Sequence, residues 1–338
     1  MAARRRCRSD RLKARSAVAK RSRADLASTV ARPHPTLPRQ RGRVGWGFIA
    51  APYLWLIGFF LVPFLIVLKI SLSETAIAQP PYVPVLDFTA GFRGIRDFVS
   101  GLSLANYITI AGDDLYVFSY LKSLKVAAVS TAILLLCGVP LAYAMARAPR
   151  RAQPLLVTLV VLPFWTSFLI RVYAWINILQ RDGLLNQALI WLGVVDEPAT
   201  WLATDTAVYI GLVYSYLPFM VLPIYASFEK LDESLLEASA DLGCPRWKTF
   251  LVITLPLALR GLGAGALLCF VPIVGEFVVP DLLGGSDATM IGQTLWTEFF
   301  ANKDWPVASA VAVVLVVLLM APMAVYQHLQ TREIEGRQ

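Results

Sequence analysis

The sequence predicts an all-helical protein that crosses a membrane six times, and two observations lead to this fold class. Hydrophobic residues make up 57% of the 338 residues and charged residues 16%, whereas a soluble domain has under half apolar and roughly a quarter charged residues. The apolar residues also come in separated blocks of about twenty, the length that an α-helix needs to cross a bilayer. These observations exclude an ordinary soluble globular protein.

The expected spans begin and end where charged or loop residues interrupt the apolar sequence. They cover residues 46–70, 126–146, 155–178, 207–228, 261–279 and 307–326. The first block is too long for the apolar region of a secretory signal, so we expect it to be retained as a span. The third and fifth blocks each contain one ionisable residue, Arg171 and Glu276. The six spans would form one membrane domain over residues 46–328.

Basic residues gather at the N-terminus. Residues 1–45 contain 14 Lys or Arg and two Asp, without apolar periodicity, so we expect a disordered tail. The loops and tails on that side of the membrane, including a C-terminal tail at 329–338, hold 23 Lys or Arg, and the opposite loops at 71–120, 179–206 and 280–306 hold four. Because cytoplasmic segments carry this excess, both termini are expected in the cytoplasm. The basic arm indicates anionic membrane lipid as a partner, and not nucleic acid.

The loop at 71–120, between the first two spans, is long and contains Pro80, Pro81 and Pro84 near its start. Loops of this length are uncommon in compact proteins unless they have a role. Two interpretations stay open: the loop covers neighbouring helices, or it contacts an external partner.

The cytoplasmic loop 229–260 contains the signals of a helix, a glycine and a second helix. Ser234 and Glu237 have the spacing of a capping box, in which each side chain satisfies the other residue's amide at a helix start. The helix is expected to end at Gly243, because glycine adopts the left-handed conformation without a Cβ penalty. Pro245 then suits the first turn of a new helix.

Both helices of this loop are expected to be amphipathic. One face of the first carries Leu235, Ala238 and Leu242. One side of the second carries Trp247, Phe250, Leu251 and Thr254. Pro256 is expected to kink the chain toward the fifth span. Such a protrusion suits docking to a soluble partner; the alternative, a helix on lipid headgroups, fits less well because acidic residues dominate its first half.

No catalytic residue, cofactor or metal site is expected. The sequence lacks a GxxxxGK[ST] phosphate loop, so ATP would have to be hydrolysed by another chain. His34 and His328 are isolated, which excludes a histidine-based triad or metal cluster. The four cysteines have no CxxC spacing, so neither a disulfide nor a metal site is indicated. They are Cys7, Cys137, Cys244 and Cys269. The chain is therefore not expected to be an enzyme.

The loop resembles the EAA signature of permease subunits in binding-protein-dependent ATP-binding-cassette (ABC) importers. The resemblance is carried by Glu237-Ala238-Ser239, three further residues, Gly243, and then Ile253-Thr254-Leu255-Pro256. Ser239 stands where Ala is usual in the family. Longer stretches are similar to the spermidine/putrescine branch, most of all to its putrescine permeases, and these are 162–175, 213–225, 274–285 and 303–312.

This resemblance implies a type I importer permease of MetI-like architecture that imports a polyamine, putrescine or spermidine, across the inner membrane. It implies a second permease subunit in a heterodimer, an ABC ATPase dimer that uses the ATP, and a periplasmic solute-binding protein. The coupling loop would sit in a cleft of the ATPase. Its coupling residues would be Glu237, Ala238, Ser239, Asp241, Gly243 and Pro256, with Glu237 as contact and Gly243 as hinge. Alternatives are a permease for another small cationic or amine solute, a secondary transporter, or a membrane scaffold.

The substrate path is expected at ionisable and aromatic groups of the spans. A charge inside a membrane is costly and usually faces a cavity or a partner. Glu276, followed by Asp281, suits a cationic amine; the alternative is that Glu276 pairs with Arg171 and holds two spans together. Aromatic faces attract ammonium groups. The candidates are Trp165, Tyr173, Trp175, Tyr214 and Tyr216.

Overall fold

The computed structural model describes residues 46–85, 96, 100–285 and 289–335, and the expected tail at 1–45 lies outside them. The chain divides into two units, Met1–Pro63 and Phe64–Gln338. In the first unit, α2 (Trp46–Leu56) and the π-helix η1 (Ile57–Leu61) form one helical run that continues into α3 (Val62–Ser71). The run Pro52–Ser71 is long and apolar enough to cross a membrane.

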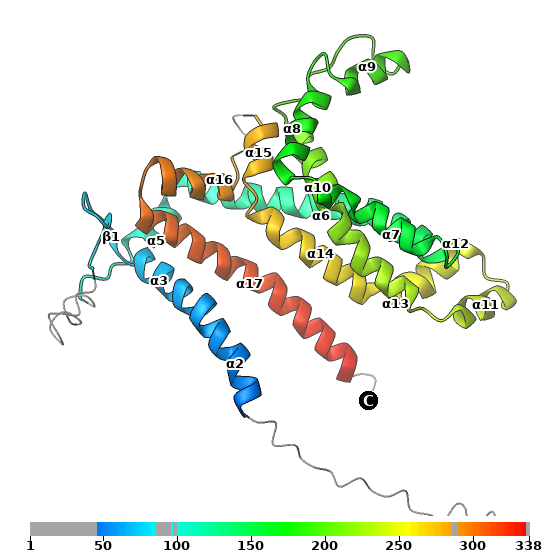
Figure 1. Ribbon diagram of the computed structural model, residues 1–338, viewed down its shortest axis with the longest axis horizontal. Helices are drawn as coiled ribbons and strands as arrows, with labels where there is room; N and C mark the ends of the chain where they lie inside the picture. The colour runs from blue at the N-terminus through cyan, green and yellow to red at the C-terminus, as the bar shows by residue number, and fades with distance from the viewer. Residues whose placement is uncertain (1–45, 86–95, 97–99, 286–288, 336–338) are drawn as a thin grey trace, which may run out of the picture. The chain divides into compact units, whose positions relative to one another are not determined.

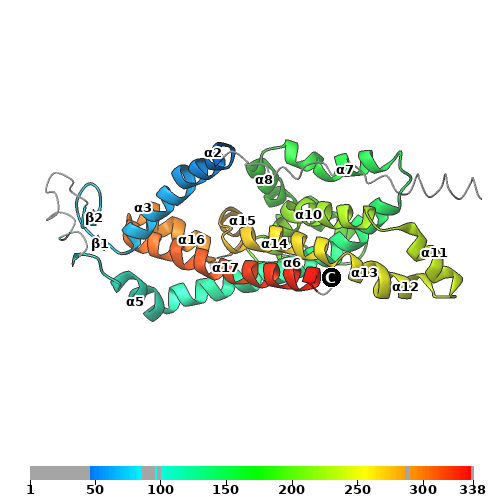
Figure 2. The ribbon, with the colours of Figure 1, turned by 90° about the horizontal axis from the view of Figure 1, so that it is seen from below.

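The second unit consists of helices and one two-stranded ribbon (Figure 1, Figure 2). After α3 its elements are β1 (Glu74–Thr75), β2 (Tyr82–Val83), α5 (Ala105–Gly112), α6 (Asp114–Arg147), α7 (Gln153–Val161), η3 (Leu162–Trp165), α8 (Phe168–Leu179), α9 (Leu184–Trp191), α10 (Asp205–Glu229), α11 (Glu233–Asp241), α12 (Arg246–Thr249), η4 (Phe250–Thr254), α13 (Leu255–Leu257), α14 (Leu259–Val274), α15 (Val278–Leu283), α16 (Ile291–Trp296), η5 (Thr297–Ala301) and α17 (Trp305–Glu335).

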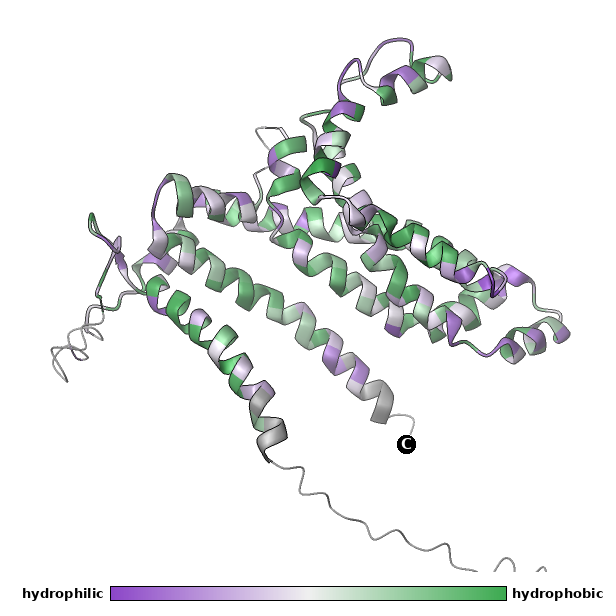
Figure 3. Cartoon of the chain, viewed as in Figure 1, coloured by the Kyte–Doolittle hydropathy of each residue, from purple (hydrophilic) through white to green (hydrophobic). Residues whose placement is uncertain are grey.

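The helices fit the expected membrane-spanning fold class. Within the described residues, four helices are long and apolar enough to cross a membrane, and there are up to six spans if each of two bent helix pairs counts as one. Figure 3 shows hydrophobic residues along α6, α14 and α17, and more hydrophilic residues toward the end of α17. The helix α17 runs through Glu335, into the segment expected to be a tail.

The core of the second unit lies where α6, α10 and α14 pack together. Its fully buried side chains include Leu134 of α6, Met220 of α10 and Ile273 of α14. Helices α10 and α14 approach closely because Gly261 presents no side chain: a Cβ there would lie 2.7 Å from the Pro223 carbonyl oxygen. Small residues at helix interfaces permit such close approach of backbones in membranes.

The second expected span forms part of a longer helix. Helix α6 begins at Asp114, where the Asp113 carboxylate accepts a hydrogen bond from the Leu115 N–H at 2.9 Å. Lys122 and Lys125 interrupt the apolar pattern but not the helix, because lysine is a good helix former. Lys122 forms an ion pair at 3.4 Å with Asp205, the first residue of α10.

The long loop before α6 contains the ribbon β1–β2 and helix α5. Asn106 of α5 donates hydrogen bonds to the carbonyl oxygens of Ser71 and Ser73, and its neighbour Tyr107 shares one with the Ser71 hydroxyl. The Thr75 hydroxyl of strand β1 donates a 2.8 Å hydrogen bond to Asp304, the residue before α17. The loop therefore covers the ends of neighbouring helices.

Two expected spans are broken. The third bends by 89° between Trp165 and Phe168, so it is a helix pair and not one straight helix. The chain bends by 67° at Ala258, two residues after Pro256 and before the fifth expected span, which confirms the predicted kink; the span itself is interrupted at residues 275–277 between α14 and α15. The expected spans 155–178 and 261–279 therefore do not form single straight helices, since apolar composition reports the length of a segment and not its straightness.

Candidate functional site

The protruding loop forms the expected helix–glycine–helix. Helix α11 ends in a Schellman motif: the Cys244 N–H donates to the Ser239 carbonyl at 3.0 Å, and the Gly243 N–H to the Ala240 carbonyl at 2.9 Å. Gly243 has φ of +73°, which L-residues with a Cβ adopt at a cost. The glycine ends α11 as predicted.

The expected capping box does not form, because α11 begins earlier than its pattern requires. The N-cap is Asp232, whose carboxylate accepts a hydrogen bond from the Ser234 N–H at 3.0 Å. This backbone hydrogen bond lowers the pKa of Asp232 from its ordinary value. Ser234 and Glu237 both lie inside the helix, so neither is an N-cap.

Ser239 holds the two helices of the loop together. Its hydroxyl lies 2.6 Å from the Thr249 hydroxyl of α12, and both side chains are buried. An alanine at 239 could not form this bond. The departure from the usual EAA residue therefore has a structural consequence, since it adds a polar tie between α11 and α12.

The second helix does not place its apolar residues on one side. Trp247 and Leu251 are more than half exposed, whereas Phe250 packs on the core and Thr254 is buried. The reason is the π-helical segment η4, whose wider turn rotates the following residues relative to an α-helix. The prediction of a common face was therefore wrong.

The expected coupling residues lie mainly on the exposed side of this protrusion. Glu237, Ala238 and Asp241 are exposed on α11, and Pro256 is exposed on α13. Exposed apolar side chains accompany them, namely Leu235, Leu242, Trp247, Leu251 and Val252. Figure 1 and Figure 2 place α11 at the opposite end of α6 from α16. The loop thus offers a partly apolar, acidic surface at one end of the second unit.

The second candidate site lies at the break between α14 and α15. Glu276 is half-buried there; its Oε2 accepts a 2.6 Å hydrogen bond from the Tyr216 hydroxyl, and its Oε1 accepts the Val278 N–H at 3.1 Å. Helix α16 packs closely against this break, since a Cβ at Gly292 would lie 2.8 Å from the Glu276 carbonyl oxygen. The carboxylate is thus fixed by neutral donors.

The alternative pairing of Glu276 with Arg171 does not form. Arg171 Nε and Nη1 are buried and have no hydrogen-bond partner among the described residues. The guanidinium lies instead over the rings of Phe164 and Phe168, 4.9 and 5.7 Å from their centroids. Ring contacts connect the surroundings of Arg171 with the hydrogen-bond partner of Glu276: Phe164 contacts Phe219, which contacts Tyr216. Arg171 lies in α8, after the 89° bend that breaks the third expected span.

The other expected path residues do not converge on Glu276. Trp165 is 77% and Tyr173 54% exposed. Tyr214 contacts Trp175 edge-on at 5.4 Å, and both line a separate apolar pocket of about 460 Å³ between α8, α10 and α6. Asp281 accepts a 2.9 Å hydrogen bond from Gln293. Of the candidate aromatics, Tyr216 alone bonds to the carboxylate in the described part of the chain.

Sequence reasoning missed the rings that continue from Glu276. The ring of Phe277 stacks on Trp296 with centroids 4.9 Å apart and an interplanar angle of 11°. Further rings follow in the segment WTEFFANKDW at 296–305. The signal was present there as aromatic residues alternating with acidic ones.

Comparison with known proteins identifies the family. Residues 138–334 match the family described as "binding-protein-dependent transport system inner membrane component". The chain belongs to this family. It is therefore a multi-pass inner-membrane permease of an ABC importer and not an enzyme, and the predicted family and fold are confirmed.

Similar proteins include two named spermidine/putrescine transport system permease protein PotB. That of Escherichia coli is 42% identical over 224 residues, which cover 66% of this chain and 81% of the relative. That of Haemophilus influenzae is 38% identical over 278 residues, covering 82% and 91%. A crystal structure of a bacterial ABC transporter importing alginate has a similar fold, with a TM-score of 0.66 and 15% identity, covering 85% of this chain and 94% of that one.

Proposed function

We propose that this permease imports an aliphatic polyamine, putrescine or spermidine, as one of two permease subunits driven by a separate ABC ATPase dimer. The observation that carries the proposal is the Glu276 carboxylate, which lies half-buried at a helix break and, within the described residues, accepts hydrogen bonds from the neutral donors Tyr216 and Val278. A carboxylate in such a place suits a cation. The names of the two relatives support the choice of a polyamine.

The loop 229–260 provides the docking element for the ATPase. Its exposed apolar and acidic residues fit an amphipathic helix that enters a groove on a soluble partner. The greater number of Lys and Arg on this side supports a cytoplasmic position of the loop and of both termini. Hairpin β1–β2 and helix α16, at the opposite end of α6, then face the periplasm, where a solute-binding protein would dock. An alginate transporter of similar fold has been crystallised with a substrate-bound periplasmic protein.

The test is ATP-dependent polyamine uptake into proteoliposomes that contain the complete transporter. Glu237→Lys reverses a charge on the exposed face of α11, and we expect ATP hydrolysis to continue while uptake falls. The matched control is Glu197→Lys, which reverses an exposed charge in the loop between α9 and α10. Uptake without the ATPase under an ion gradient, or equal uptake by Glu237→Lys and the control, would reject the proposal.

A further inference from the structure

Five rings form a continuous series that starts beside Glu276. In order of contact these are Phe277, Trp296, Phe300, Phe299 and Trp305, here called the aromatic ladder. Successive centroids lie 4.9, 4.1, 4.9 and 5.3 Å apart. The ladder joins the break after α14 to the start of α17 through α16 and η5.

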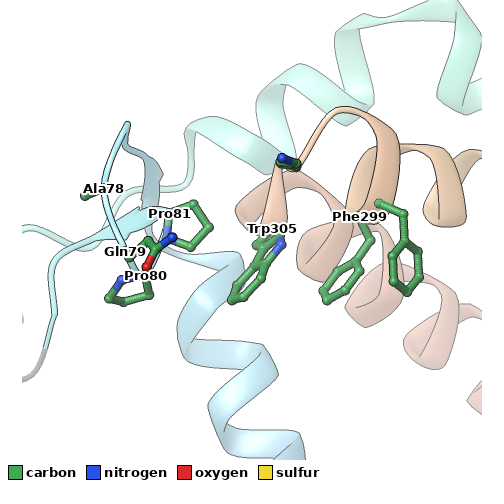
Figure 4. Close-up of a pocket in the computed structure, with 8 residues that line it drawn as sticks. Ala78, Gln79, Pro80, Pro81, Phe299 and Trp305 are labelled. Carbon is green, nitrogen blue, oxygen red and sulfur yellow. The ribbon is translucent and has the colours of Figure 1, made fainter.

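The far end of the ladder opens into a pocket beside the ribbon. Phe299, Phe300 and Trp305 line a cavity of about 510 Å³ together with Pro80 and Pro81. Figure 4 shows the ring of Trp305 between the prolines of the hairpin and the ring of Phe299. The ladder therefore runs from the hairpin end of the second unit to the Glu276 carboxylate.

Acidic groups accompany the rings along this segment. Its described carboxylates are Glu276, Asp281, Glu298 and Asp304, and each accepts hydrogen bonds from neutral groups. Residues 275–306 hold five Asp or Glu and one Lys. A surface with one sign of charge attracts and concentrates ligands of opposite sign.

The ladder also offers accessible ring surface. Trp296 is 46% and Phe300 54% exposed. Cations bind to the faces of aromatic rings, and methylene groups pack against rings as apolar surface. A molecule with ammonium groups separated by short methylene chains has groups suited to both the carboxylates and the rings of this segment.

We propose that the aromatic ladder and its carboxylates are a binding track along which an aliphatic polyamine moves from the hairpin pocket to Glu276. This inference rests on the proposed function and adds the residues of the path. Lys303, which lines the pocket, opposes a cation at that end. The track therefore predicts opposite effects for two neighbouring changes: removing a ring weakens polyamine binding, and removing the Lys303 charge strengthens it.

The test is equilibrium dialysis of radiolabelled putrescine and spermidine against the purified permease–ATPase complex without the binding protein. We expect Trp296→Leu to raise Kd about three- to tenfold, the loss of one cation–π contact, and Trp296→Phe to stay close to the wild type. Lys303→Asn should lower Kd; asparagine also tolerates the φ of +56° at this position. The control is Trp191→Leu, an exposed tryptophan on α9 away from the ladder.

An unchanged Kd in Trp296→Leu, or a change equal to that in Trp191→Leu, would overturn the track, as would competition by uncharged 1,4-butanediol equal to that by putrescine. Absence of saturable binding to the wild-type complex would also overturn it. Uptake by the complete wild-type transporter separates the two proposals. If the wild type imports polyamine while Trp296→Leu binds normally, the track alone fails; if the wild type imports none, the proposed function fails with it.

Discussion

Substitutions at Gly243 distinguish backbone conformation from bulk as the reason for a glycine in the coupling loop. A Cβ at Gly243 would meet no atom of the described chain within 4 Å, so an added side chain is not excluded by space. The φ of +73° is the constraint. A residue with a Cβ in the left-handed helical conformation costs about 1–2 kcal/mol, and asparagine less.

We therefore expect Gly243→Ala to impair coupling more than Gly243→Asn, although asparagine is the larger residue. A cost of 1–2 kcal/mol changes the ratio of ordered to disordered hinge by a factor of about 5 to 30. Gly243→Val should be worse than alanine, because β-branched residues are rarest at positive φ. Uptake per ATP hydrolysed should fall in the order Gly, Asn, Ala, Val.

The assay is polyamine uptake and ATP hydrolysis by the reconstituted transporter, with hydrogen exchange of residues 233–249 as a direct measure of loop order. Amounts of inserted permease must match between variants. If Ala couples like the wild type while Asn does not, then bulk at the docked surface decides and the backbone argument is refuted.

Three further predictions concern the two candidate sites. Ser239→Ala and Thr249→Val should each lower the free energy of opening the loop by about 0.5–1.5 kcal/mol. The double variant should lower it by less than the sum of the two, which a double-mutant cycle measured by hydrogen exchange would show. Asp232→Ala should loosen α11 while Asp232→Asn preserves it. Folding lowers the pKa of Asp232, so the stabilisation of the helix by this carboxylate is complete above the ordinary pKa of about 3.9 and is lost as pH falls through the folded-state pKa. Hydrogen exchange of the loop measured over a pH series would detect this loss. Glu276→Gln keeps the acceptor for the Val278 N–H but removes the charge, so diamine uptake should fall about tenfold or more; normal uptake at matched protein levels would make Glu276 structural.

The spans could be predicted from the sequence because apolar blocks of membrane length have few other interpretations. Their breaks could not. The bend before α8 and the interruption after Val274 arise inside segments that are apolar overall, and neither Pro163 nor the Gly275-Glu276 pair fixes by itself where a helix bends or stops. Likewise, Lys122 and Lys125 ended the predicted second span although the helix continues through them. Charge marks where a segment leaves hydrocarbon, and not where its helix ends.

The candidate sites divide in the same way. Gly243 was predictable because local backbone chemistry demands glycine there. The partner of Glu276 was not, because Tyr216 lies 60 residues away in the chain and meets it only through the packing of α10 on α14. The sequence left Arg171, the one cation in the third span, open as an alternative partner, whereas its guanidinium lies against aromatic rings in the folded chain.

Helix α14 connects the two candidate sites physically. It begins one residue after the bend at Ala258 and ends two residues before Glu276, so its 16 residues extend about 24 Å from the coupling loop to the carboxylate. At Gly261 it lies so close to α10 that a Cβ there would be 2.7 Å from the Pro223 carbonyl oxygen. We therefore expect a displacement of the loop to shift α14 against α10, which carries Tyr216. Because coupling between two sites is reciprocal, occupancy at Glu276 should in turn bias the loop, and a changed ATP hydrolysis rate in Glu276→Gln without substrate would be the measurable sign of that connection.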